Sequence, residues 1–308
     1  MLKYQNGNCS VCIEDDGTKT RKTPRSIPSR LIFPESINLK ITNRCDLKCP
    51  FCCEEQGAGG AHAPAVEIRQ ALFGVPAGVE VTLSGGNPLC HPDVESIIRM
   101  FNSRGLITNI SVNELHLGPI RNRKRLQDLI DEGSLQGIGV SISPTWQKPT
   151  FGLDTNNLVA HVIVGVHSFE TISAIRKCYK KVLISGYKFT GPGKNFYSRR
   201  EEHESQHLKK NMWKFFYRKY GEGIISFDSL AIEQLEVWKH LSTENWLEFY
   251  MGDDGEFSCY YDVVAHCIKE TLISPKGIYF VDVLEGFSLL MDLRKNKEQE
   301  RALALGAY

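Results

Sequence analysis

From Ser36 onward, short apolar runs alternate with stretches whose apolar residues recur at helical spacing. The runs predict six strands, at 37–42, 79–84, 108–112, 137–143, 158–166 and 181–185. Helices are expected between most of them, at 94–103, 123–131 and 171–179. This alternation is typical of a parallel sheet with right-handed crossovers. Because about 150 residues hold six strands, we expect an α/β fold built as a partial (β/α)6 TIM-like barrel, and not a complete eightfold one.

The two ends of the chain have other patterns. Residues 4–21 predict a hairpin with turns at Asn6-Gly7 and Asp16-Gly17, and a basic, proline-containing connector follows. Near the other end we expect a long polar and aromatic helix at 204–220 and strands at 224–227 and 248–261, with Asp253-Asp254-Gly255 as a hairpin turn. We therefore expect an N-terminal hairpin and connector at 1–34, a barrel core at 35–200 and an α+β C-terminal extension at 201–308.

The composition is that of an ordinary soluble globular protein, with 42% hydrophobic and 24% charged residues. The longest apolar runs, such as 162–166, are too short to span a bilayer, so no membrane partner is expected. The first residues lack the charged start and apolar stretch of a secretory signal. These features predict a cytoplasmic protein.

Ten cysteines then need an explanation, and in a reducing cytosol the competing ones are metal binding and burial. Cys45, Cys49 and Cys52 form a C-x3-C-x2-C run directly after the first barrel strand. Three thiolates on one loop can ligate three irons of a cubane cluster and leave the fourth iron open. A structural zinc site usually has four ligands, and only three are close here. The run therefore favours an open iron–sulfur cluster.

This run resembles the signature of the radical S-adenosylmethionine (SAM) superfamily, including the aromatic Phe51 before the third cysteine. The segment 84–88 (Ser-Gly-Gly-Asn-Pro) resembles that family's Gly-Gly-Glu-Pro motif, with Asn87 in place of glutamate. The resemblance covers roughly residues 36–195. It implies a 4Fe–4S cluster on Cys45, Cys49 and Cys52, reduced by a flavodoxin- or ferredoxin-type partner. It also implies cleavage of SAM to a 5′-deoxyadenosyl radical that abstracts hydrogen from a substrate.

The same resemblance implies which other residues bind SAM. The Gly-Gly motif would present backbone groups to the amino group of SAM, and segments 162–166 and 186–188 resemble the two adenine contacts of the family. Two serines that alternate on the fourth strand share a face that could reach the ribose or carboxylate. The expected SAM-binding residues are Gly85, Gly86, Asn87, Pro88, Ser141, Ser143, Val164, Gly165 and Tyr187.

Substrate contacts are expected on the third strand, where polar residues occur at period two and share one face. If that face looks into the barrel it meets the substrate, whereas on the outside it would meet a helix, where polar groups fit poorly. The candidate catalytic residues are Asn109, Ser111, Asn113 and His116. His161 and His167 also lie near strand ends, although a lone histidine is more often structural.

Other cysteines allow two readings. Cys9 and Cys12 could pair with Cys259 and Cys267 around a second cluster or zinc, or all four could simply be buried. Any of Cys90, Cys178, Cys259 and Cys267 could donate a hydrogen atom to a substrate radical, and the sequence selects none of them. Cys53 is interpreted as packing, because the spacing favours Cys52 as the third ligand.

A basic and aromatic stretch at 188–220 bears on the substrate, since cations meet phosphates and aromatic rings stack on bases. Its alternative reading is a helix with an aromatic core face. The leading hypothesis is isomerisation or rearrangement of a modified nucleotide or DNA base, because the chain resembles compact radical SAM proteins, some from phages, that serve DNA hypermodification. A phage-encoded chain would act in the host cytoplasm. The alternatives are a peptide-modifying enzyme (an epimerase or crosslinking enzyme) and a non-catalytic SAM- or Fe–S-binding protein.

Overall fold

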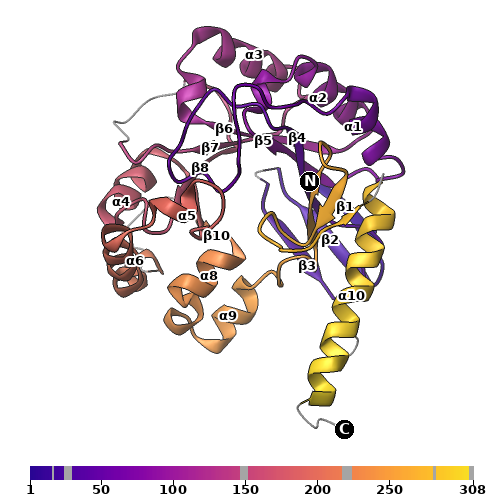
Figure 1. The fold of residues 1–308 in the computed structure, drawn as a ribbon. Coiled ribbons are helices and arrows are strands. Elements are labelled where there is room, and N and C mark those ends of the chain that lie inside the picture. Colours follow the sequence, from indigo (N-terminus) through magenta and orange to yellow (C-terminus); the bar gives the residue numbers. More distant parts are fainter. Residues whose placement is uncertain (16, 24–29, 146–151, 217–223, 280–281, 305–308) are drawn as a thin grey trace.

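The fold was analysed in a computed structural model that describes residues 1–15, 17–23, 30–145, 152–216, 224–279 and 282–304. Its centre is a ten-stranded sheet with the order β10-β9-β8-β7-β6-β5-β4-β11-β12-β13 (Figure 1). The first eight strands in this order are mutually parallel, and β12 pairs antiparallel with both β11 and β13. The expected α/β partial barrel is confirmed.

Six of these strands are the predicted ones: β4 (Ser36–Thr42), β5 (Glu80–Gly85), β6 (Ile107–Asn113), β7 (Gly137–Ser141), β8 (Leu158–Ile163) and β9 (Lys181–Ser185). The helices α1 (Ala65–Ala71), α2 (Val94–Ser103), α3 (Ile120–Asp131) and α4 (Phe169–Cys178) lie between them in sequence. The 3-10 turns η1 (Pro88–Cys90) and η2 (Glu114–Leu117) follow β5 and β6. The sequence pattern therefore located each core strand to within a few residues.

Strand alternation separates the core from the barrel interior. On β4, Ile37, Leu39 and Ile41 are fully buried on the face that the helices cover. Ser36 and Asn38 point the other way and line the interior cavity. Burial of an isoleucine side chain contributes about 1.5–3 kcal/mol, so the helix-covered face fixes the register of each strand. The opposite face is then free to carry polar groups.

The N-terminal segment forms a separate antiparallel sheet of β1 (Leu2–Asn6), β2 (Cys9–Ile13) and β3 (Lys19–Lys22). The expected hairpin is therefore a three-stranded sheet, because the chain after the second turn pairs back onto β2. Lys19 forms an ion pair with Glu80 at the start of β5, and Arg21 forms one with Glu35 just before β4. The small sheet thus lies against the N-terminal ends of the barrel strands. Most of the basic connector lies outside the described residues.

The C-terminal segment extends the barrel at both edges. β10 (Ile224–Phe227) pairs with β9, and β11 (Ser258–Asp262) pairs with β4, both in parallel. β12 (Cys267–Lys269) and β13 (Ile278–Tyr279) continue beyond β11. The helices of this part are α8 (Ser229–Leu235), α9 (Thr243–Phe249) and α10 (Val283–Ala304), with the 3-10 turn η4 (Val237–His240). The segment therefore extends the wall of the partial barrel at both edges.

Two expectations for this part were wrong. Residues 243–249 form α9, capped by the Ser242 hydroxyl, so Asp253-Asp254-Gly255 lies between a helix and β11 and not in a hairpin. The long helix expected at 204–220 is divided into α6 (Arg199–Asn211) and α7 (Trp213–Phe216), after the short α5 (Gly193–Phe196), and residues 217–220 lie outside the described part. The Ser198–Glu201 capping box starts α6 earlier than the apolar pattern indicated. In the part of the chain that the structure describes, no helix is long and apolar enough to cross a membrane.

Candidate active site

The three signature cysteines lie on one loop at the C-terminal end of β4. The loop is held from both sides by backbone hydrogen bonds: the Cys45 N–H donates to the Gly57 carbonyl at 3.0 Å, and the Gly193 N–H donates to the Cys52 carbonyl at 2.8 Å. Each of the three cysteines is only partly buried. Burial, and after it the neighbouring Cys52 and Cys45 thiols, raises the pKa of Cys49 to about 11. The thiols of Cys45 and Cys52 are therefore close enough to Cys49 to raise its pKa.

The number of these thiols fits a cluster with one open iron. A structural zinc usually takes four protein ligands, and the signature run offers three. Cys45 also belongs, with Asp46 and His116, to a donor set whose ligand atoms all lie within 4.8 Å of one another. In a cubane each thiolate binds a different iron. Because burial keeps the thiols protonated, loading iron must displace their protons, which predicts uptake that improves as pH rises.

Gly85 and Gly86 pack directly against the start of the cluster loop. A Cβ on Gly85 would lie 2.3 Å from the Thr42 carbonyl oxygen, and one on Gly86 would lie 2.3 Å from the Arg44 carbonyl oxygen. The Gly86 N–H donates to the Thr42 carbonyl at 2.9 Å, and the Asn87 N–H donates to the Arg44 carbonyl at 2.7 Å. The missing side chains therefore allow two backbone segments to touch, one after β5 and one that leads into Cys45.

Asn87 connects the two motifs through its side chain. It is almost fully buried, its amide oxygen accepts from the Leu89 N–H at 3.1 Å, and its amide nitrogen donates to Asp46 Oδ1 at 3.2 Å. The same nitrogen lies 3.2 Å from Cys90 Sγ. The sequence suggested that a negative charge is lost at this position. The structure places the Asp46 carboxylate beside it, one residue after the first cluster cysteine.

Asp46 also contacts His116, one of the four candidate catalytic residues. His116 Nε2 lies 2.9 Å from Asp46 Oδ1, and its Nδ1 is buried with no hydrogen-bond partner. Burial lowers the pKa of His116 although the carboxylate acts in the opposite direction. His116 is therefore neutral at pH 7 and orients Asp46 toward the motif after β5. Pro88 is buried at the first position of the 3-10 turn η1, next to this contact.

The other expected SAM residues line the same end of the sheet. The Ser143 N–H donates to Glu114 Oε1 at 2.9 Å, and Ser141 ends β7. Val164 is buried in the core, and Gly165 has φ of +78° and faces the Glu201 carbonyl. Their placement around the strand ends is shown by the fold, and their contact with SAM stays a prediction.

Tyr187 is buried and holds the loop that supports the cluster. Its hydroxyl donates to the Gly193 carbonyl at 2.6 Å, and its backbone exchanges two hydrogen bonds with the Gln234 amide. Its ring packs on Phe189 and Tyr197, with centroids 4.9 and 4.6 Å away. Phe189 remains about half exposed in this cluster. Tyr187 therefore holds Gly193, whose N–H in turn donates to the Cys52 carbonyl of the cluster loop.

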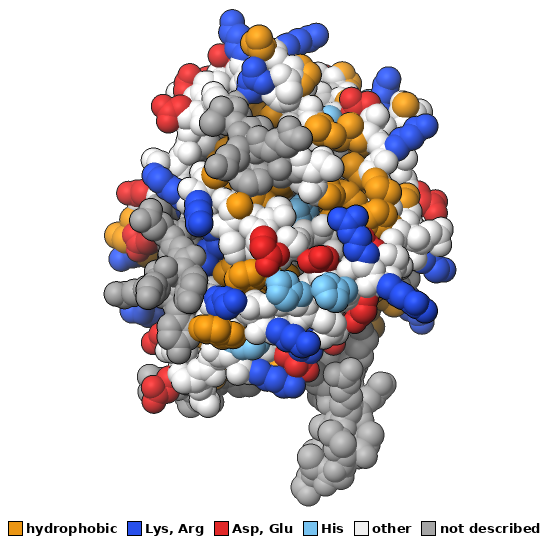
Figure 2. Space-filling model, turned by 90° about the vertical axis from the view of Figure 1, so that its left-hand side faces the viewer, with side chains coloured by type: hydrophobic (Ala, Val, Ile, Leu, Met, Phe, Trp, Pro, Cys, Tyr) orange, Lys and Arg blue, Asp and Glu red, His pale blue; other side chains and the backbone are white. Residues whose placement is uncertain are grey.

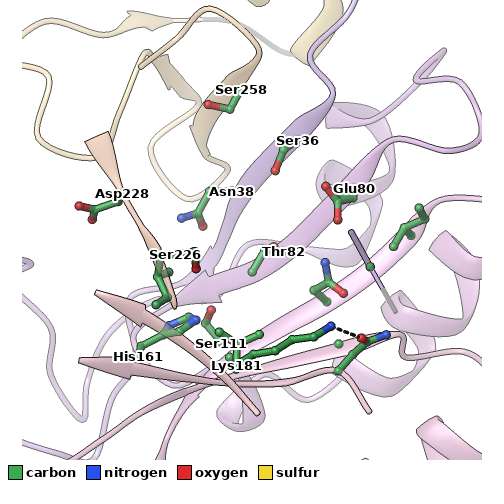
Figure 3. A pocket seen from close by; sticks show the side chains of 18 of the residues that line it. Ser36, Asn38, Glu80, Thr82, Ser111, His161, Lys181, Ser226, Asp228 and Ser258 are labelled. Carbon is green, nitrogen blue, oxygen red and sulfur yellow. Dashed lines mark hydrogen bonds between the residues drawn. The ribbon is translucent and has the colours of Figure 1, made fainter. Parts of the chain in front are cut away.

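Below the loop, the barrel encloses a cavity of about 970 Å³ (Figure 3). Its lining residues with a neutral amide or hydroxyl include Ser36, Asn38, Thr82, Asn109, Ser111, Ser226 and Ser258, and charged residues such as Glu80, Lys181 and Asp228 lie among them. Asn109 and Ser111 thus face the interior, whereas Asn113 caps the 3-10 turn at the strand end by accepting from the Leu115 N–H. Two predicted candidates lie in the cavity wall, and the other two, Asn113 and His116, are not among its lining residues.

Two glycines on β7 make room for polar side chains in this cavity. A Cβ on Gly139 would lie 2.3 Å from the His161 ring, and one on Gly137 would lie 2.6 Å from Asn109 Oδ1. Burial, and after it the Lys188 ammonium, lowers the pKa of His161 to about 4. His161 is therefore a neutral imidazole that can donate and accept one hydrogen bond each. His167, by contrast, is a structural group whose Nε2 lies 3.1 Å from the Ile142 carbonyl.

A buried ionic network that the sequence analysis missed joins the C-terminal segment to the cluster loop. Lys40 Nζ lies 3.0 Å from Asp262 Oδ2 and 3.4 Å from Glu54 Oε1, and the Tyr260 hydroxyl donates to Glu54 Oε1 at 2.6 Å. The only signal in the sequence was a lysine inside an apolar strand. Its partner Asp262 is more than 200 residues away, so no local pattern could have identified it.

The remaining cysteines do not form a second metal site. Cys259 pairs in register with Ile37 and is buried in the apolar core, and it is also among the residues that line the cavity. Cys267 is buried against Gly277, while Cys9 and Cys12 lie on β2. No donor set found among the described residues contains any of these four.

Part of the expected basic and aromatic surface is internal packing. Phe215 stacks on Phe169, and Phe216 stacks on Phe227. Lys188 faces Asp228, and Lys209 forms an ion pair with Glu236. The described part of 188–220 therefore combines internal packing with aromatic rings that stay exposed, since Phe189 and Trp213 are 54% and 41% exposed.

Fold and site together define a class: a parallel partial barrel that carries an open three-cysteine cluster loop above an interior cavity. The family model of the radical SAM superfamily matches residues 39–195. The chain belongs to this superfamily, which uses a 4Fe–4S cluster and SAM.

Among curated proteins, the chain is 32% identical over 131 residues to the PqqA peptide cyclase of Rhodopseudomonas palustris, covering 38% of this chain and 33% of that protein. It is 24% identical over 158 residues to the GTP 3′,8-cyclase of Listeria monocytogenes, covering 49% and 46%. The chain thus matches a third to a half of the length of these relatives. Among solved structures, Streptococcus suis SuiB bound to its precursor peptide SuiA has a TM-score of 0.54 at 13% identity, covering 83% of this chain and 65% of that one.

Proposed function

We propose that this radical SAM enzyme isomerises or rearranges a nucleotide or nucleic-acid base held in the barrel cavity. The observation that carries the proposal is the ring of neutral amides and hydroxyls on alternate strand positions below the cluster loop. When bound, the cluster and SAM supply a 5′-deoxyadenosyl radical that takes a hydrogen atom from the substrate. The chain's own residues must then orient one C–H bond and exclude water.

The cavity wall matches the edge of a heterocyclic base. Asn38 and Asn109 each offer an amide donor and acceptor, and His161 adds a neutral imidazole. Such groups discriminate by hydrogen bonding, because a substrate that lacks a partner leaves them buried and unpaired. Lys181 and Lys188 also line the cavity and can meet a phosphate. A base with a phosphate would therefore use the wall more fully than an apolar side chain would.

The N-terminal sheet borders the lower end of the cavity, since Leu2, Ile13 and Glu14 are among its lining residues. An extended chain along the barrel axis would meet this sheet, so a macromolecular substrate would more easily insert one residue. This favours a compact substrate or a single flipped base.

Peptide modification is the second candidate, and the similarity to PqqA peptide cyclases favours it. In that case one peptide side chain would enter the cavity. A non-catalytic SAM- or Fe–S-binding role is the third. The nearby Asp46 carboxylate argues against it, because it restores a negative charge beside Asn87.

The test measures 5′-deoxyadenosine release by reconstituted enzyme with SAM, dithionite and an extract of the native host. Parallel aliquots of the extract are treated with nuclease or protease and then filtered. Loss of the stimulation after nuclease, or its passage through a small-molecule filter with a nucleotide in the filtrate, supports the proposal. Loss after protease alone contradicts it and puts peptide modification in its place. A flavodoxin- or ferredoxin-type reductant remains a prediction.

A further inference from the structure

Helix α6 carries a motif that the cluster and SAM chemistry leave unused. Residues 203–207 read His-Glu-Ser-Gln-His, which places His203 and His207 one turn apart on one face of the helix. Two histidines with this spacing on a helix are a recurrent pair of zinc ligands. The motif lies on the outer surface, since none of its residues lines the barrel cavity.

A neighbouring helix brings a further ligand to the same place. Glu170, in the first turn of α4, lies with Oε1 3.9 Å from His207 Nδ1. Ligand atoms of Glu170, Glu204 and His207 all lie within 4.8 Å of one another. The His203 ring is nearly parallel to that of His207, at 15° with centroids 6.5 Å apart. Figure 2, which looks onto this side of the molecule, shows histidine side chains gathered beside acidic ones.

The charges at this cluster call for a cation. Two carboxylates converge on one imidazole, and the ion pairs recorded for the described residues include no lysine or arginine partner for Glu170 or Glu204. Like charges this close repel each other, and a positive charge between them, on a protonated His207 or on a metal ion, offsets that repulsion. Imidazole and carboxylate together suit a borderline divalent ion such as Zn²⁺.

We propose that Glu170, Glu204 and His207, with His203 as an additional ligand, form a divalent transition-metal site that joins α4 to α6. Zinc bonds of about 2.0–2.1 Å would bring the donor atoms closer than they now lie, and exposed side chains on two helices can close that gap by rotation. Glu204 acts as a ligand and not as a hydrolytic base, because the site lies outside the cavity. The metal would stiffen α6, whose Glu201 carbonyl packs against Gly165 at the edge of the expected adenine site.

Zinc binding by the cluster-loaded enzyme tests the proposal. The protein is dialysed to equilibrium against buffered micromolar Zn²⁺, and zinc and iron are counted in the same sample. We expect one zinc per chain without loss of iron, and a Kd at least about tenfold weaker in His207→Ala. The matched control is His266→Ala, because His266 Nε2 lies 3.6 Å from Glu67 Oε2 in an exposed pair that lacks a third ligand. This control should bind zinc as the wild type does.

Thermal unfolding gives a second measurement on the same samples. Zinc should raise the Tm of the wild type and of His266→Ala and leave that of His207→Ala unchanged. Alanine is a good helix former at this partly exposed position, so the variant is expected to fold. Equal zinc affinity of the wild type and His207→Ala at constant iron would overturn the proposal, as would a wild type that takes up zinc only as iron is lost.

Discussion

Substitution of Gly86 by alanine tests how closely the two motifs are packed. The added Cβ would lie 2.3 Å from the Arg44 carbonyl oxygen and 2.7 Å from its carbon, both backbone atoms that cannot rotate away. An ordinary contact needs more than about 3.4 Å, so residues 44 and 45 must move by about 1 Å. Such overpacking costs about 1–3 kcal/mol. Because Cys45 is the first cluster ligand, the shift displaces the metal relative to SAM.

A displacement of this size reduces a rate about 100-fold when reacting groups must stay aligned. We therefore expect Gly86→Ala to release 5′-deoxyadenosine about 100-fold more slowly than the wild type under dithionite. Gly59→Ala is the matched control. Gly59 lies on the same loop, and a Cβ there would meet no atom within 4 Å. Its rate should stay within about twofold. A Gly86→Ala variant with a wild-type rate and full iron content would refute the packing argument.

Three further predictions concern the cavity and the buried ion network. Asn109→Ala should lower substrate-stimulated 5′-deoxyadenosine release about tenfold, because one buried hydrogen bond is lost, and leave unstimulated SAM cleavage unchanged; equal effects on both rates would contradict a substrate role. Lys40→Met should lower the free energy of unfolding by about 3–5 kcal/mol, since it leaves Glu54 and Asp262 without their buried cation. A loss below about 1 kcal/mol in a urea titration would disprove this. The third prediction concerns pH. The folded-state pKa of His161 is lowered to about 4, so the unfolded chain binds the proton first as pH falls below about 6.5. Wild-type stability should therefore drop by up to about 3 kcal/mol between pH 6.5 and 4 relative to His161→Gln, whereas parallel pH curves would show that His161 is solvated.

The core strands could be predicted because each buries one face under a helix and so shows a continuous or alternating apolar pattern. Val94–Ser103 was predicted with its observed bounds, since Val94, Ile97, Ile98 and Phe101 form one buried stripe. The C-terminal segment was harder. β11 is a strand because it pairs with β4, more than 200 residues earlier, and local sequence contains no sign of that partner.

The same contrast holds for the site. The cysteine run and the Gly-Gly motif are local patterns whose chemistry can be read from residue type and spacing. The Asp46 carboxylate beside Asn87 and the N-terminal sheet that borders the cavity are long-range arrangements. Phe215 and Phe216 show the opposite error, because the aromatic composition of 188–220 suggested a binding surface while these two rings pack internally.

Adjacent cysteines permit the most direct test of the account. Cys52 is the expected third ligand of the 4Fe–4S cluster, and the neighbouring Cys53 is held by its carbonyl, which accepts from the Thr190 hydroxyl at 2.7 Å. Iron, sulfide and 5′-deoxyadenosine release are measured after anaerobic reconstitution of Cys52→Ala and Cys53→Ala. The account predicts a full cluster and SAM cleavage in Cys53→Ala and neither in Cys52→Ala. A Cys52→Ala variant that retains both, while Cys53→Ala loses them, would contradict it.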